Sequence, residues 1–337
     1  MDKRLIPGKF GISGTVQDVS LRELKAGHIN STYLADTPDG KYILQSLNMS
    51  VYSDHRAVER NLSGIVRCFE EYDGTPGVSI PHYLRTGDGS FFYHSGSEVW
   101  RMYRYSEACE PTEPPELCAG YACGAFMRVT GSKSPELTPA IDGFHDFRHH
   151  YEEYRAALRR RPWKMTSEST AIAEWLEPYY VHICDTFREV PKRPVHGDAK
   201  ADNFIIGTDR TKCTVIDLDT VMYSYAAVDY GDLIRSSAGS GDMDAAAAIT
   251  EGFSEGLAGV LTPIEISSLY HGVIYVTAEL AFRYLTDFIN GAAFFRSKTP
   301  EQCLERSRQL LVQLSGFTSK SREFDEIIRK YFSGGEK

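Results

Sequence analysis

The sequence predicts an α+β fold in two lobes, a small antiparallel sheet with one helix followed by a larger, mostly helical part. Three observations predict it. Short strand-like runs separated by turn residues fill the first hundred residues. A proline-rich connector, EACEPTEPPEL, then changes the composition near Ser106, and helical periodicity prevails after it. We therefore expect an N-terminal nucleotide-binding lobe over residues 1–106 and a C-terminal catalytic lobe over residues 107–337.

The N-terminal lobe is expected to open with a three-strand meander over residues 20–47. Gly27 separates its first two runs, and the turn Pro38-Asp39-Gly40 separates the second from the third. The segment 53–72 then repeats apolar residues at helical spacing, from Val58 to Phe69. Two further strands are expected within residues 89–95 and 98–106.

The C-terminal lobe is expected to hold helices within residues 115–131, 146–160, 167–190 and 262–291. The third of these contains Pro178, which argues against a straight helix. The fourth begins with Thr262 as its N-cap, Pro263 in the first turn and Glu265 completing a capping box. A small β segment, residues 193–222, interrupts the helices.

The bulk composition narrows the class of protein. The 337 residues carry a net charge of −9, which argues against a nucleic-acid-binding protein because such proteins usually have a basic surplus. The start lacks the apolar core of a signal peptide, and no run approaches the roughly 20 apolar residues of a membrane span. The seven cysteines are scattered and suggest neither a disulfide framework nor a zinc site. We expect a cytoplasmic protein without nucleic-acid or membrane partners.

The stretch RPVHGDAKADNFIIG, residues 193–207, carries the candidate chemistry. Asn203 begins one β-branched run and Asp217 ends the next, CTVIDLD, with a turn-rich loop between them. An antiparallel hairpin would therefore return Asp217 to the end where Asp198 and Asn203 lie. One interpretation is a polar loop without function, because Asp and Asn are common in turns.

The other interpretation is a catalytic loop for phosphoryl transfer. Carboxylate and amide oxygens suit Mg²⁺, so Asn203 and Asp217 are the expected metal ligands. A separate carboxylate must orient the acceptor hydroxyl and take its proton, and Asp198 is the expected base. The spacing matches the general phosphoryl-transfer pattern of an Asp, an Asn five residues on and a later metal-binding Asp.

HGDAKADN and VIDLDTVM resemble the aminoglycoside-phosphotransferase and choline-kinase superfamily, which has a two-lobed protein-kinase-like fold. AGHINSTY, KYILQSLN, VDYGDLIR and FRYLTDFINGAAFF further resemble the N-acetylhexosamine 1-kinases, over about residues 25–312. The resemblance implies an enzyme that uses ATP and Mg²⁺ to phosphorylate the anomeric hydroxyl of N-acetylglucosamine or N-acetylgalactosamine.

The resemblance also assigns residues on the acceptor side. Asp198 would hold the sugar hydroxyl, and Asp219 and Thr220 would face the sugar beside the metal. Arg283 and Asp287, with Glu279, recur every four residues on one helix; they would line the sugar pocket, or only form ion pairs along the helix. Three supporting residues complete the set: His196 for the catalytic loop, and Asp229 and Asp232 as loop-orienting or helix-capping groups.

On the nucleotide side, the expected phosphate donors are Gly27, Asn30, Ser31 and Thr32. Gln45 stands where protein kinases have a lysine on the third strand, so Lys41 or another cation would have to supply the charge. Glu59 occupies the position of the glutamate that usually pairs with that lysine. The adenine is expected at the lobe junction, against the backbone from about Met102 to Glu107, which includes Tyr105.

Two alternatives remain open at this point. A kinase of the same fold could act on an aminoglycoside, a choline-like amino alcohol or another sugar. A cationic acceptor would need an acidic site, which the carboxylates of DYGD and TDF permit. The chain could also be an inactive kinase-fold binding module, a reading that only Gln45 favours.

Overall fold

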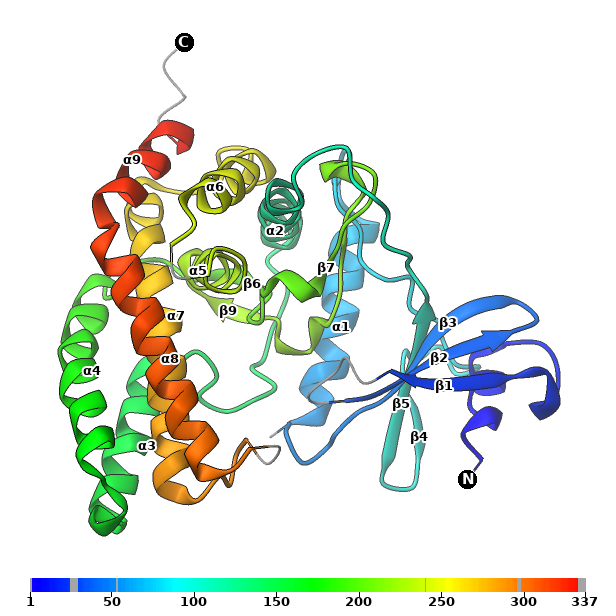
Figure 1. Ribbon diagram of the computed structural model, residues 1–337. Coiled ribbons are helices and arrows are strands. Elements are labelled where there is room, and N and C mark those ends of the chain that lie inside the picture. The colour runs from blue at the N-terminus through cyan, green and yellow to red at the C-terminus, as the bar shows by residue number, and fades with distance from the viewer. Residues whose placement is uncertain (1, 25–29, 53, 240, 296–297, 333–337) are drawn as a thin grey trace.

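The computed structural model describes residues 2–24, 30–52, 54–239, 241–295 and 298–332. Gly27 lies outside these residues. The described chain forms an antiparallel sheet on one side and a helical lobe on the other, with one helix between them (Figure 1). The predicted α+β class is confirmed.

The N-terminal sheet has five antiparallel strands in the order β1-β2-β3-β5-β4. Their bounds are Ser20–Leu24 (β1), Ser31–Thr37 (β2), Gly40–Ser46 (β3), Tyr93–Ser95 (β4) and Glu98–Arg104 (β5). Alternate residues of these strands form one face of the sheet, and the short 3₁₀ turns at the N-terminus pack against that face. The opposite face, which includes Ile43, Val99 and Tyr103, belongs to a core shared with the helical lobe.

Helix α1, His55–Glu70, lies between the sheet and the helical lobe (Figure 1). The Asp54 side chain caps it by accepting a hydrogen bond from the Arg56 amide (2.9 Å). Its apolar face, from Ala57 to Ile65, is buried in the shared core. From the same helix, Asn61 donates to the Val221 carbonyl oxygen (3.1 Å), close to the candidate active site.

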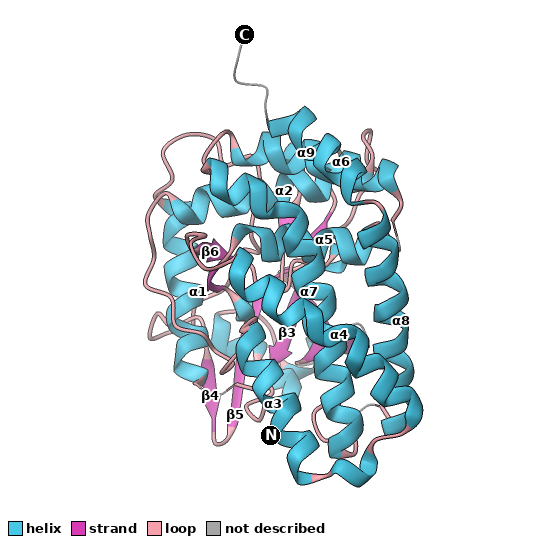
Figure 2. Cartoon of the chain, turned by 90° about the vertical axis from the view of Figure 1, so that its left-hand side faces the viewer, coloured by secondary structure: helices cyan, strands magenta, loops and turns pink. Residues whose placement is uncertain are grey.

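The C-terminal lobe consists mainly of helices (Figure 2). They are Pro115–Gly131 (α2), Phe147–Arg160 (α3), Ser167–Thr186 (α4), Ala226–Ser237 (α5), Met243–Leu257 (α6), Pro263–Asn290 (α7), Pro300–Ser319 (α8) and Ser321–Phe332 (α9). Helix α7 begins with the predicted Thr262 capping box and runs through the centre of the lobe, packed against α3, α4, α5 and α8. Helix α4 continues through Pro178 without a break.

Helices α2 and α6 approach each other closely because glycines face each other between them. A Cβ added at Gly120 or Gly124 would overlap the backbone of α6 at Ile249 or Phe253. A Cβ added at Gly252 would overlap the Leu117 carbonyl oxygen of α2. The pair therefore packs backbone against backbone beneath the catalytic segment.

The predicted β segment holds two short antiparallel pairs. Strand β6, Arg193–Val195, pairs with β9, Met222–Ser224. Strand β7, Phe204–Ile205, pairs with β8, Thr214–Val215, and this pair is the predicted hairpin. It is shorter than its sequence runs, because Asn203 closes a 3₁₀ turn before β7 and Leu218–Thr220 forms another after β8.

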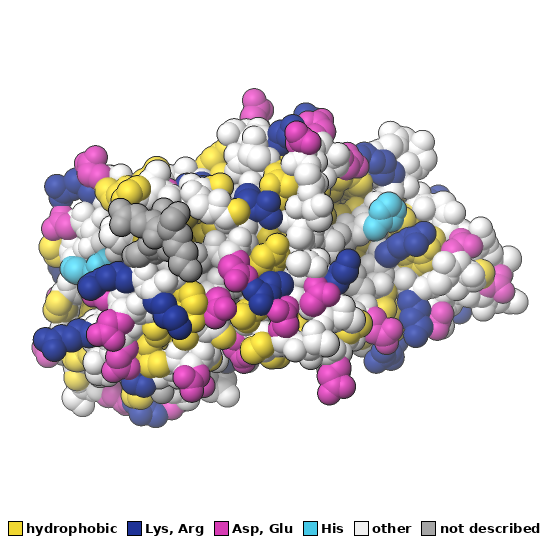
Figure 3. All heavy atoms as spheres, turned by 90° about the horizontal axis from the view of Figure 1, so that it is seen from above, with side chains coloured by type: hydrophobic (Ala, Val, Ile, Leu, Met, Phe, Trp, Pro, Cys, Tyr) yellow, Lys and Arg dark blue, Asp and Glu magenta, His cyan; other side chains and the backbone are white. Residues whose placement is uncertain are grey.

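Among the described residues, no helix combines the length and the apolar character that crossing a membrane requires. Acidic and basic side chains intermingle on the face shown in Figure 3. This mixture agrees with the modest net charge of −9. Charged residues close to the candidate site, and not a one-signed surface, are therefore expected to set its electrostatics.

Candidate active site

The loop between β6 and β7 presents Asp198 and is held by a buried carboxylate. The backbone amides of His196 and Gly197 both donate to Asp229, at 2.6 and 2.9 Å. Gly197 has φ +81°, and an added Cβ would overlap the Thr220 carbonyl oxygen, so the loop requires glycine here. Burial raises the pKa of Asp229, and the hydrogen bonds from these two amides oppose the rise. Of the two roles expected for Asp229, the structure shows the loop-orienting contacts.

His196 ties this loop to the strand that leads to Asp217. Its Nδ1 accepts a hydrogen bond from the Asp198 amide (3.2 Å), and its Nε2 donates to the Ile216 carbonyl oxygen (2.8 Å). With one nitrogen accepting and the other donating, the ring is a neutral imidazole. Its contacts are those of a loop support.

The Asp198 carboxylate accepts hydrogen bonds from two neighbouring side chains. Lys200 Nζ donates to it at 2.6 Å and Asn203 Nδ2 at 3.1 Å. Burial alone would raise the pKa of Asp198, but the charge and hydrogen bond of Lys200 outweigh it and lower the pKa. The carboxylate is therefore ionised at neutral pH, as a group that accepts a proton must be.

Asn203 and Asp217 lie at the same end of the hairpin, as predicted. Asn203 donates through Nδ2 to the carbonyl oxygen and the carboxylate of Asp198, so its Oδ1 remains as the atom that could bind a metal ion. Asp217 adopts φ +62°, ψ 55° at the start of its 3₁₀ turn. Burial, then the negative charges of Asp219 and Asp198, raise its pKa to about 6.

These residues fit a magnesium ion. An amide oxygen and a carboxylate are hard oxygen ligands. The raised pKa of Asp217 shows a carboxylate whose neighbours do not neutralise it, so a bound cation would favour its ionised form.

Asp219 does not face the acceptor, and that expectation is corrected. It is 2% exposed and accepts hydrogen bonds from Tyr52 Oη (2.8 Å) and Asn30 Nδ2 (2.8 Å). The guanidinium of Arg101 pairs with both of its oxygens. Side chains from three places in the N-terminal lobe thus converge on one carboxylate of the C-terminal lobe.

Arg101 is a buried cation beside Gln45. It lies on β5 directly opposite Gln45 of β3, and its Nε donates to the Gln45 side-chain oxygen (2.8 Å). Burial opposes the charge of Arg101, but Asp219 outweighs it and raises the pKa of the guanidinium. Gln45 therefore orients Arg101, and Lys41 lies exposed at the far end of β3.

The residues expected to donate hydrogen bonds to the phosphates make different contacts in the structure. Asn30 donates to Asp219 and accepts from the Asn48 amide (3.1 Å), so it is part of the lobe junction. Thr32 Oγ1 accepts from Gln45 Nε2 (3.0 Å). Ser31 is exposed at the start of β2, and its role at the phosphates stays a prediction.

Two further nucleotide-side residues were expected at the site. Glu59 hydrogen-bonds with His94 of β4 (2.6 Å), and its supporting role at the site stays a prediction. Tyr105 follows β5 with its amide donating to the Lys41 carbonyl oxygen (3.1 Å) and its side chain exposed. Its backbone contact with adenine stays a prediction.

A cavity of about 110 Å³ opens beside Asp198 and is the candidate acceptor pocket. Its charged lining residues come from α5, α7 and the loop before α3. Besides Asp198 itself, they are His145, Asp232, Arg235, Glu279 and Arg283. Asp232 is paired with Arg235 (2.6 Å), so DYGD supplies no free carboxylate for a cationic acceptor.

His145 links this pocket to the catalytic loop. Its Nδ1 lies 3.0 Å from Glu279 Oε2 and its Nε2 lies 2.6 Å from the Gly197 carbonyl oxygen. Both partners are acceptors, so both ring nitrogens must donate and the ring is an imidazolium. Burial disfavours that charge, but Glu279 outweighs it and raises the pKa of His145 to about 9.

Of the two helix α7 residues expected in the acceptor pocket, one lines the cavity and the other does not. Arg283 lines the cavity as expected, with its guanidinium over Phe144 (5.6 Å), Phe294 (5.3 Å) and Phe295. Asp287 is buried and accepts from the Phe294 and Phe295 amides (2.8 Å each), so it shapes the loop after α7 and does not line the cavity.

Thr220 is also corrected. It is buried, and its Oγ1 donates to the His196 carbonyl oxygen (3.0 Å). It therefore supports the loop from behind, without facing the cavity.

Sequence reasoning missed Lys200, His145 and Arg101. Lys200 lies two residues after Asp198, a spacing that could have suggested a neighbour in an extended loop. His145 and Arg101 had no local signal, because each meets its carboxylate more than a hundred residues away in the chain.

Solved structures show the same fold at low sequence identity. The microcompartment-associated aminopropanol kinase is 14% identical, with a TM-score of 0.66 over 95% of this chain and 97% of that one. An aminoglycoside phosphotransferase from Alicyclobacillus acidocaldarius is 14% identical, with a TM-score of 0.62 over 93% of both chains. A choline/ethanolamine kinase family protein from Mesorhizobium loti is 13% identical, with a TM-score of 0.61 over 99% and 100%.

A family model described as the phosphotransferase enzyme family, APH, matches residues 20–261. The match spans β1 to the end of α6 and includes Asp198, Asn203 and Asp217. The chain therefore belongs to the APH phosphotransferase enzyme family.

Proposed function

We propose that this phosphotransferase transfers the γ-phosphoryl group of ATP to the anomeric hydroxyl of an N-acetylhexosamine, N-acetylglucosamine or N-acetylgalactosamine. One observation carries the choice of acceptor. The carboxylates that line the pocket beside Asp198 are matched by Arg235, the charged His145 and Arg283. A cationic acceptor gains little in such a pocket, whereas a neutral sugar offers hydroxyl and amide groups to both signs of charge.

Asp198 would orient the acceptor hydroxyl toward the γ-phosphate and take its proton. Lys200 and Asn203 fix that carboxylate in place, and Asp229 fixes the backbone beneath it. Asn203 and Asp217 would hold Mg²⁺, which neutralises charge on the phosphates when bound. Positioning of this kind supplies most of the rate in phosphoryl transfer.

The contacts of Gln45 give this residue a role that does not require an inactive binding module. Its side-chain oxygen accepts a hydrogen bond from Arg101, whose charge is paired with Asp219 at the lobe junction. Asp198, the proposed base, lies beside Asn203, a proposed metal ligand, and this arrangement supports an active enzyme.

The test is an ADP-release assay with Mg²⁺-ATP on five acceptors: N-acetylglucosamine, N-acetylgalactosamine, galactose, choline and kanamycin. Phosphorus NMR of the product reads the position of the new phosphate. Turnover on an N-acetylhexosamine with an anomeric phosphate is the expected result. Turnover only on choline or kanamycin would keep the role of Asp198 and discard the sugar. Binding of Mg²⁺-ATP without turnover on any acceptor would count against the proposal as a whole.

A further inference from the structure

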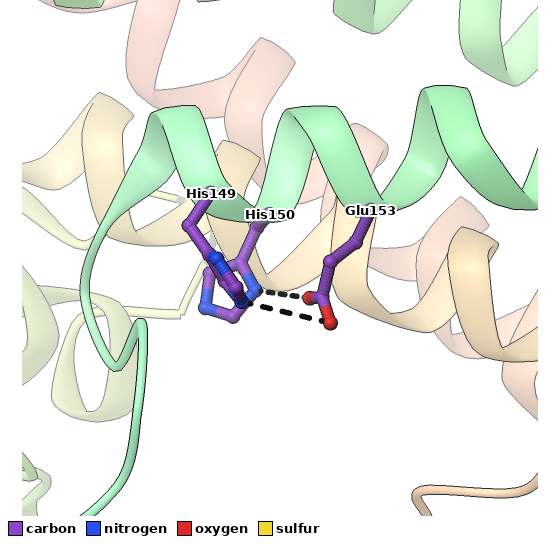
Figure 4. Close-up of side chains that lie close together, drawn as sticks. All are labelled: His149, His150 and Glu153. Atoms are coloured by element: carbon purple, nitrogen blue, oxygen red, sulfur yellow. Dashed lines mark hydrogen bonds and ion pairs between the residues drawn. The ribbon is translucent and has the colours of Figure 1, made fainter.

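Three potential metal ligands gather on the first turns of α3, and none of them belongs to the catalytic loop. His149, His150 and Glu153 each direct one ligand atom toward a common point, and these atoms lie within 4.8 Å of one another (Figure 4). Oε1 of Glu153 lies 3.6 Å from His149 Nε2, and Oε2 of Glu153 lies 3.0 Å from His150 Nδ1. Tetrahedral ligands at Zn²⁺ bonds of about 2.0–2.1 Å are separated by about 3.3 Å, so each histidine has a Glu153 oxygen near the required spacing.

A second observation points to the same place. The other nitrogen of His150, Nε2, lies 3.3 Å from Oε1 of Glu279, a carboxylate on α7 that is 1% exposed. Neither of these two buried atoms makes a hydrogen bond of acceptable geometry within the described residues. A carboxylate behind the far nitrogen of a histidine is the arrangement that orients metal-ligating histidines in proteins.

We propose that His149, His150 and Glu153 bind a divalent transition-metal ion of the Zn²⁺ class, with Glu279 behind His150. Two imidazoles and one carboxylate suit Zn²⁺, whereas Mg²⁺ prefers oxygen ligands. The side chains of His149 and Glu153 are 42% and 52% exposed, so the ion has an entry path and water completes its coordination. The proposal does not depend on which acceptor the enzyme phosphorylates.

The contacts of Glu279 connect the proposed metal site to the catalytic loop. Its second oxygen holds His145, which donates to the Gly197 carbonyl oxygen beside Asp198. The proposed metal site and the acceptor pocket thus share one buried carboxylate.

Isothermal titration of Zn²⁺ into the full chain, with excess MgCl₂ to fill the oxygen-ligand sites, tests the proposal. The expected result is one Zn²⁺ per chain, with affinity weakened at least about tenfold in His149→Ala and in Glu153→Gln. Both side chains are exposed, so unchanged thermal unfolding of the variants shows that the fold is kept. The matched control is His182→Ala, which removes one member of the His182–His271 pair between α4 and α7 and should leave the affinity unchanged.

The pH provides an independent readout. An imidazole must be neutral to bind a metal ion, so a proton competes with Zn²⁺ for His149 and His150. Zn²⁺ affinity should therefore fall as the pH decreases from 8 toward 6. Absence of Zn²⁺ binding, equal affinity in the two α3 variants and the wild type, or loss of binding in His182→Ala would each overturn the proposal.

Discussion

At the residue scale, the Asp198 carboxylate is fixed by Lys200 and Asn203, and its lowered pKa keeps it ionised. Asp198→Asn keeps the size of the side chain but removes the proton acceptor. We expect kcat to fall by about 10²–10⁴, the usual contribution of a general base, with little change in nucleotide affinity. Steady-state kinetics and calorimetric titration of ADP measure the two quantities. Turnover close to that of the wild type would remove Asp198 from the mechanism.

Asp217 gives a pH dependence whose sign follows from its environment. Its pKa is raised from 3.8 to about 6, so its ionisation costs stability as the pH rises through about 6 in the metal-free protein. Asp217→Asn should therefore raise the free energy of unfolding at pH 7.5 by about 1–3 kcal/mol without Mg²⁺, while turnover is lost. Urea unfolding at pH 5 and pH 7.5 measures the effect, which should shrink at the lower pH. A destabilised variant at pH 7.5 would contradict this account.

At the element scale, Arg101 on β5 and Asp219 after β8 fasten the two lobes together. Removing one partner leaves a buried charge without compensation, and we expect Arg101→Met to cost about 3–5 kcal/mol. The double variant Arg101→Met with Asp219→Leu should be less destabilised than the sum of the two single variants. Urea unfolding of all four proteins completes this cycle. Additive losses would show that the pair is not coupled.

The packing of α2 against α6 provides a second test at this scale. Gly252→Ala places a methyl group against the Leu117 carbonyl oxygen and should cost about 1–3 kcal/mol. The matched control is Gly131→Ala at the end of α2, where an added Cβ meets nothing within 4 Å. That change should be neutral or slightly stabilising, because alanine favours helix. Thermal unfolding compares the two, and equal shifts in Tm would show that close approach is not the cause.

At the scale of the whole molecule, local patterns predicted the fold class and the hairpin that joins Asp198, Asn203 and Asp217. Hairpin geometry depends on neighbours in sequence, so spacing alone was informative. Three residues have partners that the sequence did not reveal, for one physical reason. Asp219, Asn30 and Glu59 were assigned by position in a motif, but their partners come from distant parts of the chain.

Arg101 is a second example of a residue whose partner is distant in the chain and could not be predicted from local sequence. Alternation along EVWRMYR places Trp100 and Met102 on one face of the sheet and Arg101 on the other. A charged residue in a strand is usually expected to face solvent. The structure covers that second face with the C-terminal lobe, which is why a charged residue in a strand is 1% exposed and paired with Asp219.

Because the two lobes share one hydrophobic core, we expect them to unfold together. The core joins Ile43, Val99 and Tyr103 of the sheet to residues of α2, α5 and α7, so opening one lobe exposes apolar surface of the other. The tryptophans report on each side separately: Trp100 lies in β5, and Trp163 and Trp175 lie in the helical lobe. Trp100→Phe, and the double variant Trp163→Phe with Trp175→Phe, leave fluorescence from one lobe at a time. Their urea unfolding curves should each superimpose on that variant's own far-ultraviolet circular dichroism curve. A fluorescence midpoint in either variant that differs from its circular dichroism midpoint would show that the lobes fold as separate units.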